Sequence, residues 1–370
     1  MLYYIKQICR IKFKFKKEIK SKIMQINTVT GKIKREELGV VSTHEHVLLD
    51  LTAFYRSLPV KGISDPSTEK VKIQNLGILY RDCYALKDNL ILDDEKLQTK
   101  ELSYFKKAGG NTVVDASLDG IGRDPMALKR IAEKTGLNII MGTGFYVGET
   151  HPAALKNMTD DQIACIMTDE IINGVKGTSV KAGYIGEIGI SEIFDDRERA
   201  VLRAAAIAQQ NTGVGVNVHI NPWTVNGKEA ADILLKCGAD RSRICISHID
   251  VENREDYVLS LLDKGVFVEF DNFGKEYYIK KEVRNSGYGL FVHDTERVSF
   301  LKKLIDRGYV SQILLSCDVC LKILLHRYGG WGYDHLLTNI VPMMREFGIS
   351  ENDITTMLKD NPAAWLAGEK

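Results

Sequence analysis

The stretch GVVSTHEHVLLD, residues 39–50, combines a short apolar run with the motif His44-Glu45-His46. In a β-strand, side chains two residues apart share a face, so His44 and His46 would point the same way and Glu45 the opposite way. Two imidazoles on one face are suitable ligands for a metal ion. Two histidines at a strand end are, however, the simpler interpretation of one His-x-His motif. A metal site therefore requires that other strands of the sheet also end in suitable ligands.

Downstream of this stretch, short apolar segments alternate with segments of helical periodicity. After a first strand that ends at His46, we predict strands over residues 112–116, 138–141, 183–188, 215–219, 244–248, 266–270 and 312–317. We predict helices over residues 93–108, 125–135, 160–173, 195–210, 227–237, 254–264, 295–307, 333–347 and 351–359. Alternating strands and helices indicate an α/β fold with a parallel sheet, and eight repeats favour a closed (β/α)8 TIM barrel. No Gly-x-Gly-x-x-Gly motif follows the first strand and no P-loop is present, so a nucleotide site has no support.

Two segments near the start of the fold lie outside these repeats. Residues 24–37, MQINTVTGKIKREE, are expected to form a short β-hairpin with its turn near Thr30 and Gly31. Residues 51–95 form a long connection, and such a length is more typical of a functional loop than of a simple link.

The composition is that of an ordinary globular protein. The chain has 370 residues, of which 44% are hydrophobic and 27% charged. Its seven cysteines are odd in number and form no regular framework, which favours reduced thiols in a cytoplasmic protein over a disulfide scaffold. No apolar run approaches the about 18 residues that a transmembrane helix needs.

Residues 1–23 differ from the rest of the chain, because they carry eight Lys or Arg and one acid. A basic, partly apolar arm of this kind is suited to an anionic membrane surface or to nucleic acid. It lacks the apolar core of a signal peptide. We favour the simpler interpretation that residues 1–23 are an extension outside the fold, with Met24 an alternative start. On this interpretation residues 24–370 form one domain, with no membrane or nucleic-acid partner.

Side chains of the types that bind metals recur at the strand ends of the predicted barrel, where the active sites of such barrels lie. Imidazoles and carboxylates hold divalent transition metals, zinc most commonly. A carboxylate can bridge two ions about 3.5–4 Å apart, and a bound aspartate can accept a proton from the attacking water. We assign the first role to Glu187 and the second to Asp318. The full set of predicted ligands is His44, His46, Glu187, His219, His248 and Asp318.

The motifs around these residues resemble those of the phosphotriesterase family, which belongs to the amidohydrolase superfamily. The resemblance runs from about Met24 to the C-terminus, and it is carried by STHEHVLLD, AGYIGEIG, VNVHINP, ISHID, LLSCD and YGGWGYDHLL. It implies a (β/α)8 metallohydrolase with two divalent metal ions, zinc or alternatively manganese, and a homodimer. The resemblance further implies, position by position, that His44, His46 and Asp318 would hold the more buried ion, His219 and His248 the more exposed ion, and Glu187 both.

Many members of that family place a carboxylated lysine at the bridging position. Here AGYIGEIG offers Glu187, as in the branch called phosphotriesterase homology proteins, and the nearest lysine, Lys181, is a poor substitute. The resemblance therefore implies that a metal-bridging hydroxide attacks the carbonyl of a lactone or related ester. The alternatives are hydrolysis of a phosphoryl ester by the same metals, and a non-catalytic barrel that only binds metal.

Four residues are candidates for contact with the substrate. Tyr146 follows the third strand, where it either faces the metals or packs within its loop. Lys275, Tyr278 and Arg284 lie in the loop after the seventh strand. Their charges and hydroxyl suit an anionic group such as a phosphate or carboxylate, although a charged loop is more often simply solvated.

Overall fold

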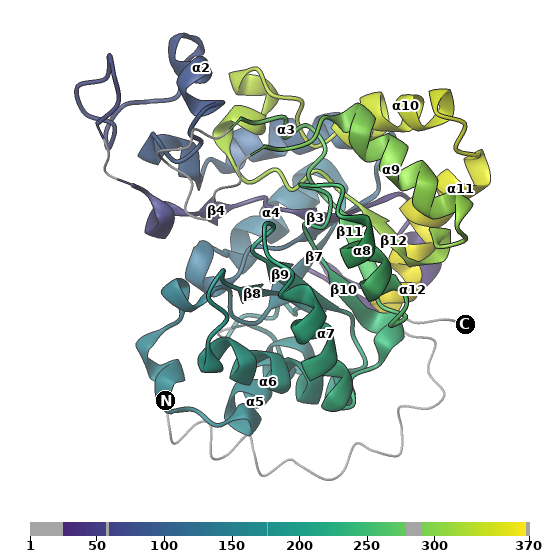
Figure 1. Ribbon diagram of the computed structural model, residues 1–370. Coiled ribbons are helices and arrows are strands. Elements are labelled where there is room, and N and C mark those ends of the chain that lie inside the picture. The colour runs from purple at the N-terminus through teal and green to yellow at the C-terminus, as the bar shows by residue number, and fades with distance from the viewer. Residues whose placement is uncertain (1–24, 57–58, 176, 279–289, 368–370) are drawn as a thin grey trace.

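Eight short strands form one parallel sheet in which each strand pairs with its neighbour in the chain (Figure 1). The computed structural model describes residues 25–56, 59–175, 177–278 and 290–367. The strands are β3 (Val41–Glu45), β6 (Thr112–Asp115), β7 (Asn138–Thr143), β8 (Tyr184–Ile190), β9 (Val216–Ile220), β10 (Ile244–Ile246), β11 (Phe267–Phe270) and β12 (Ile313–Leu315).

The first and last strands of the sheet meet, which brings the barrel almost to closure. Thr43 Oγ1 on β3 donates a hydrogen bond to Leu315 O on β12 at 3.0 Å. The amide of Asp318, just past β12, donates to His44 O at 3.1 Å. The prediction of a (β/α)8 TIM barrel is confirmed.

Helices connect the strands and surround the barrel (Figure 1). Those between the strands are α3 (Glu95–Lys107), α4 (Pro125–Thr135), α5 (Asp160–Ile172), α6 (Asp196–Thr212), α7 (Gly227–Lys236), α8 (Glu255–Leu262) and α9 (Asp294–Asp306). Three of them begin after an aspartate whose carboxylate accepts hydrogen bonds from the free amides of the first turn: Asp94, Asp124 and Asp195. These caps explain why the helix starts were readable from the sequence.

The C-terminal segment differs from the prediction. The helices expected over 333–347 and 351–359 each contain a π-helical turn, at Leu336–Ile340 and Thr356–Asp360, next to α10 (Val341–Glu346) and α11 (Glu351–Thr355). A further helix, α12 (Asn361–Ala367), was not predicted. Its fully buried Trp365 lies in an apolar cluster with residues of the strands. A Cβ on Gly215 would lie 2.8 Å from Trp365 Nε1, so the glycine before β9 allows α12 to pack there.

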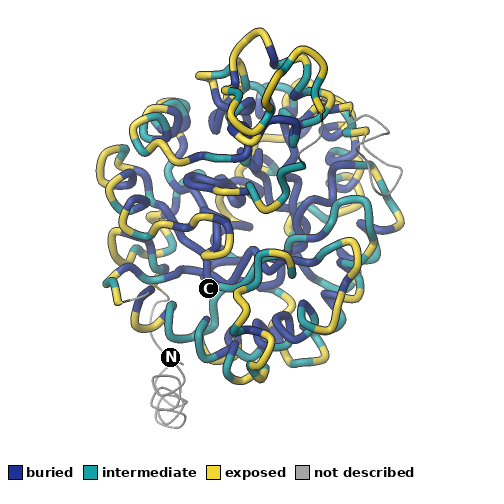
Figure 2. Tube along the Cα trace, turned by 90° about the vertical axis from the view of Figure 1, so that its left-hand side faces the viewer, coloured by how far each residue is buried: buried dark blue, intermediate teal, exposed yellow. Residues whose placement is uncertain are grey.

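The interior of the barrel changes from apolar to polar along the strands. Near their amino ends, buried apolar side chains from several strands pack with Trp365, among them Val114, Ile140, Phe267 and Leu314. Toward the carboxyl ends the buried side chains are polar, and Figure 2 shows that buried residues fill the middle of the molecule while exposed ones lie on its outside. The apolar layer therefore supports a polar layer at the end where the predicted ligands lie.

The two segments outside the repeats also form structure. The predicted N-terminal hairpin is present as β1 (Ile26–Thr28) and β2 (Gly31–Ile33), and Val29 N beside it donates to Ile139 O of β7 at 2.9 Å. The long connection after β3 is closed at its base by an antiparallel pair, β4 (Leu49–Asp50) and β5 (Ile91–Leu92). Between them it carries the short helix α2 (Leu76–Leu79), which projects beyond the barrel in Figure 1.

The described residues contain no helix with the length and apolar character needed to cross a membrane. Residues 1–23, for which an extension outside the fold was predicted, lie outside the described part of the chain.

Candidate metal centre

The two-residue period of the strands brings the predicted ligands to one end of the barrel. On β12 and just beyond it, Leu314 belongs to the apolar layer, Ser316 lies in the polar layer and Asp318 follows at the rim. On β9 the same step separates Asn217 from His219. The end of β12 thus contributes an apolar residue, a polar residue and a ligand in succession, and β9 contributes a polar residue and a ligand.

Two residues leave this register through their backbone conformation. His248 has a φ of 59° and Asp318 a φ of 48°, and both are non-glycine residues in the left-handed region. Such conformations are uncommon outside glycine and cluster at functional sites. They also explain why β10 and β12 end earlier than predicted, because the extended backbone stops before these residues.

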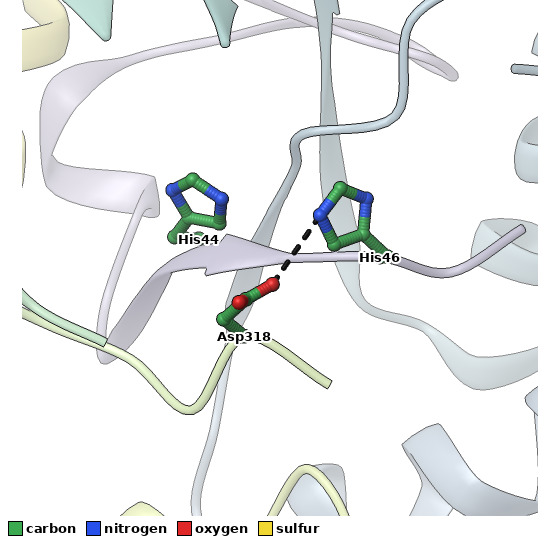
Figure 3. Close-up of side chains that lie close together, drawn as sticks. All are labelled: His44, His46 and Asp318. Atoms are coloured by element: carbon green, nitrogen blue, oxygen red, sulfur yellow. Dashed lines mark ion pairs between the residues drawn. The ribbon is translucent and has the colours of Figure 1, made fainter. Parts of the chain in front are cut away.

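The first group of side chains comes from β3 and the end of β12. Figure 3 shows His44 on β3 and His46 just past the end of this strand, with the carboxylate of Asp318 beside His46. His46 Nε2 lies 3.3 Å from Asp318 Oδ1, and one ligand atom from each of the three residues falls within 4.8 Å of the others. All three are at most 6% exposed. Their geometry suits one metal ion.

Glu187 on β8 lies between this group and the two remaining histidines. Its Oε1 is 3.3 Å from His46 Nε2, and its Oε2 is 3.3 Å from His44 Nε2. The same Oε2 is 3.2 Å from His219 Nδ1 and 3.6 Å from His248 Nε2. A carboxylate that faces both histidine pairs has the placement that a bridge between two ions requires.

Buried ligand atoms without hydrogen-bond partners support the fit to metal ions. Within the described residues, His44 Nε2, Glu187 Oε2 and Asp318 Oδ1 are buried and accept or donate no hydrogen bond. Leaving such an atom unsatisfied costs about 1–3 kcal/mol. Imidazole nitrogens and carboxylate oxygens are the donors that zinc and related divalent ions bind, so cations would satisfy all three atoms.

Three of the four histidines are oriented through their other ring nitrogen. His44 Nδ1 lies 3.2 Å from Glu269 Oε2, and His248 Nδ1 lies 3.0 Å from Asp271 Oδ1. His46 Nδ1 lies 3.0 Å from Ser117 Oγ. Such contacts fix the tautomer and the ring plane, so that each Nε2 faces the centre.

The sequence analysis missed these outer partners. Glu269 and Asp271 alternate with apolar residues in VFVEFD, residues 266–271, which placed them on the inner face of the seventh strand. That alternation was the signal that could have identified them. Glu269 is fully buried and also accepts hydrogen bonds from Asn217 Nδ2 and Ser247 Oγ at 2.8 and 2.9 Å.

The electrostatics keep the two central carboxylates ionised. Burial alone would raise the pKa of Glu187, but the charge of His44 and the close imidazoles of His219 and His248 hold it well below its usual value. Burial would likewise raise the pKa of Asp318, but the Lys275 ammonium and His46 hold it low. Burial would lower the pKa of His46, yet the adjacent carboxylates of Asp318 and Glu187 raise it to about 9. Both carboxylates are therefore available as anionic ligands, and metal binding at His46 would displace a proton.

The predicted substrate residues have different surroundings. The hydroxyl of Tyr146 lies 3.3 Å from both ring nitrogens of His219, so it faces the centre. Lys275 is 4% exposed and its ammonium donates to Asp318 Oδ2, whereas Tyr278 is 45% exposed and lies beneath the guanidinium of Arg81. Arg284 lies outside the described residues. Lys181, the nearest lysine to the bridge in sequence, donates instead to Ile172 O.

The chain is similar to known proteins in sequence and in overall structure. A model of the phosphotriesterase family matches residues 24–366. An N-acetyltaurine hydrolase from Xenopus tropicalis is 37% identical over 347 residues, covering 92% of this chain and 97% of that protein. A resiniferatoxin-binding protein from Rhodobacter sphaeroides is similar in structure, with a TM-score of 0.88, 32% identity, and coverage of 92% of this chain and 94% of that one. The phosphotriesterase homology protein from Escherichia coli, crystallised with phosphate in its active site, gives a TM-score of 0.74 at 29% identity over 89% of this chain and 99% of that one.

Proposed function

Because this chain belongs to the phosphotriesterase family and is a hydrolase of ester or amide bonds, we propose that it cleaves the amide bond of a small acylated amine with the help of two divalent metal ions. N-acetyltaurine is the first candidate substrate, since the curated relatives that match nearly the whole chain are named for its hydrolysis. Zinc suits the donor set best, with manganese as the alternative.

The observation that carries the proposal is the position of Glu187 between four histidines. Its two oxygens lie 3.2 to 3.6 Å from nitrogens of His44, His46, His219 and His248. Two divalent ions held by these residues would lower the pKa of a water molecule and polarise the carbonyl of the substrate.

Asp318 is the residue placed to move the proton. Its Oδ1 is buried, faces His46 Nε2 at 3.3 Å and accepts no hydrogen bond from the described residues. It can take a proton from the attacking water and return it to the leaving nitrogen. The overall reaction is balanced, because water and N-acetyltaurine give acetate and taurine.

Tyr146 is placed to orient the carbonyl. Its hydroxyl adjoins His219, and its ring packs edge-on to His219 and Phe54, which holds it in place. Burial and the charge of Glu187 raise its pKa well above the usual value, so the phenol keeps its proton and can donate it in a hydrogen bond.

The lactone or ester predicted from the sequence differs from an amide in its leaving group. Both reactions begin with attack on an acyl carbonyl, but an amide nitrogen needs a proton as the C–N bond breaks. Asp318 meets that need, and this favours the amide as a substrate without excluding the ester. Hydrolysis of a phosphoryl ester remains the alternative with the same metals.

A substrate panel tests the proposal. The purified chain is stripped with chelator, loaded with zinc or manganese, and assayed with N-acetyltaurine, a γ-lactone and a phosphotriester. We expect the highest kcat/KM for N-acetyltaurine, read as taurine release, and loss of turnover in Asp318→Asn. Asp88→Asn is the control, because Asp88 pairs with Lys70 and Lys322 instead of with the predicted ligands.

Turnover of the lactone without turnover of N-acetyltaurine would contradict the amide assignment and support the ester. Metal-loaded protein that turned over none of the three would contradict the assigned substrate classes altogether. The homodimer implied by the sequence stays a prediction, which light scattering after size-exclusion chromatography tests.

A further inference from the structure

Lys275 is a buried lysine whose charge is turned toward the metal centre. It lies in the loop after β11 and is 4% exposed. Its ammonium donates a hydrogen bond to Asp318 Oδ2 and a second one to Asn272 Oδ1 at 3.3 Å. A lysine is almost never buried unless it is paired, so this contact with Asp318 is part of the fold.

The contact determines which oxygen of Asp318 faces the ligands. Oδ2 is occupied by the ammonium of Lys275, whereas Oδ1 has no hydrogen-bond partner among the described residues and lies 3.3 Å from His46 Nε2. Asp318 itself has a left-handed backbone conformation, with a φ of 48°, and the ion pair with Lys275 holds its side chain in this orientation.

A fully buried arginine stabilises the backbone of Lys275. Arg297 on α9 donates through Nη2 to Lys275 O at 3.0 Å and through Nε to Asp250 O at 3.2 Å. The amide of Lys275 closes a turn by donating to Asn272 O at 3.0 Å. These hydrogen bonds fix the loop that carries the ammonium group of Lys275.

The same loop reaches the second group of ligands. Asn272, which accepts from Lys275, donates through Nδ2 to Asp271 Oδ1 at 2.7 Å. That oxygen of Asp271 is the one that lies 3.0 Å from His248 Nδ1. A continuous set of contacts therefore joins Asp318 to His248 through Lys275, Asn272 and Asp271.

We propose that Lys275 is a positioning residue of the metal centre, which turns one oxygen of Asp318 toward the ligand histidines and ties it to the partner of His248. On this proposal Lys275 binds Asp318, and not an anionic group of the substrate as the sequence suggested. A lysine that held the substrate would have to leave a buried carboxylate, and separating a buried ion pair is strongly unfavourable. The inference rests on the proposed function, because it assigns Lys275 a role toward the bound ions.

The two roles predict different kinetics for Lys275→Met, which keeps the length of the side chain and removes its charge. A positioning role predicts that one of two zinc ions binds about 10- to 100-fold more weakly, the usual effect of losing an outer partner. It also predicts that kcat falls by the same factor for N-acetyltaurine and for N-ethylacetamide, its neutral analogue without the sulfonate. Lys275→Arg, which keeps the charge, should retain more of the zinc affinity than the methionine variant.

Zinc affinity is measured by competition with a chelating dye, and the fold by thermal unfolding of the metal-free protein. Lys275→Gln is made in parallel, so that a folded uncharged variant is available if methionine is not tolerated. Lys322→Met is the matched control, because Lys322 is also paired with a buried aspartate, Asp88, and its side chain is 13% exposed. We expect the control to keep the zinc affinity of the wild type.

The proposal is overturned if the uncharged Lys275 variants bind both zinc ions as tightly as the wild type and only the KM for N-acetyltaurine rises. It is also overturned if Lys322→Met loses as much zinc affinity as they do, because the effect would then be general destabilisation. Wild-type protein that binds no zinc would be a different result, one that contradicts the proposed function itself.

Discussion

Glu187 is the residue whose surroundings differ most from those of an ordinary buried glutamate. It is 1% exposed and has imidazole nitrogens on both sides, yet its Oε2 has no hydrogen-bond partner within the described part of the chain. A buried carboxylate is normally satisfied by donors. An unsatisfied oxygen on a buried carboxylate that lies among four histidines is the arrangement expected of a ligand that bridges two cations.

Removing the charge of Glu187 should therefore remove the second ion. In Glu187→Gln we expect one bound ion instead of two and a fall in kcat of at least about 100-fold, the scale of losing one charge-stabilising group. Metal content by mass spectrometry and steady-state kinetics measure both. Glu198→Gln is the control, since Glu198 is equally buried but accepts from Gly148 N and Ser191 N on the α6 side of the fold. Two ions and full activity in Glu187→Gln would contradict the bridging role.

Tyr146 allows a milder test at the same scale. Tyr146→Phe keeps the ring contacts and removes one neutral hydrogen-bonding group, worth about 0.5–1.5 kcal/mol. We expect kcat/KM for N-acetyltaurine to fall by up to about 10-fold while metal content stays the same. Tyr257→Phe, a buried tyrosine on α8, should leave kcat/KM unchanged. An unaltered kcat/KM in Tyr146→Phe would mean that this tyrosine only packs within its loop.

At the residue scale, the sequence indicated the candidate metal ligands better than the residues that orient those ligands. His44, His46, His219, His248, Glu187 and Asp318 could be picked out because metal-binding side chains recurred at strand ends. Glu269 and Asp271 were recognisable only as residues of the inner face, since their contacts with His44 and His248 depend on distances that the folded barrel sets. The ion pair of Lys275 was hidden for the same reason.

At the scale of elements, the strands and most helices were predictable from the sequence, and the last helix, α12, was not. Each strand is a short apolar run bounded by turns, which is a local signal. Helix α12 begins at Asn361 and Pro362. It is stabilised by the packing of Trp365 against the apolar layer of the barrel. That contact is made over a long separation in sequence, so local periodicity did not reveal it.

The start of α9 joins the loop after β11 to the C-terminal segment. Asp294 accepts hydrogen bonds from Gly274 N, Arg297 Nη1 and His335 Nε2 at 2.8 to 3.1 Å, and it is 5% exposed. Burial would raise its pKa, but His335 and Arg297 hold the pKa below the usual value. Its charge therefore stabilises the fold.

Asp294→Asn should lower the free energy of unfolding at pH 7 by about 3 kcal/mol, as expected for one partner lost from a buried ion pair. Because the folded pKa of Asp294 is depressed, its contribution is complete above the unfolded pKa of about 3.9 and is lost as the pH falls through the folded pKa. Urea unfolding at pH 7 and below pH 4 should show the difference between wild type and variant shrinking in acid.

Asp306→Asn on the same helix is the matched control, because Asp306 forms a surface pair with Lys302 and its side chain is 59% exposed. A surface pair contributes at most about 1 kcal/mol. A loss in Asp294→Asn no larger than in this control, or one that does not depend on pH, would show that the start of α9 is not held by the charge of Asp294.

At the scale of the whole molecule, the described domain coincides with the segment that matches the family. The family model covers residues 24–366, and the first described residues form the hairpin beneath β7. We expect that deletion of residues 1–23 leaves kcat/KM for N-acetyltaurine and the thermal stability unchanged. Loss of hydrolysis in the shortened chain would show that the basic arm takes part in function, as in the membrane or nucleic-acid interpretation of its charge.

The barrel brings ligands from β3, β8, β9, β10 and β12 to one rim, and the whole account depends on their holding two cations together. The most direct test is the number of zinc or manganese ions bound per chain after chelation, reloading and removal of free metal. The account predicts two ions per wild-type chain, and an unfolding temperature that falls when they are removed, because ligands of the native state stabilise it. Fewer than one ion per chain, with no change in unfolding temperature on chelation, would contradict it.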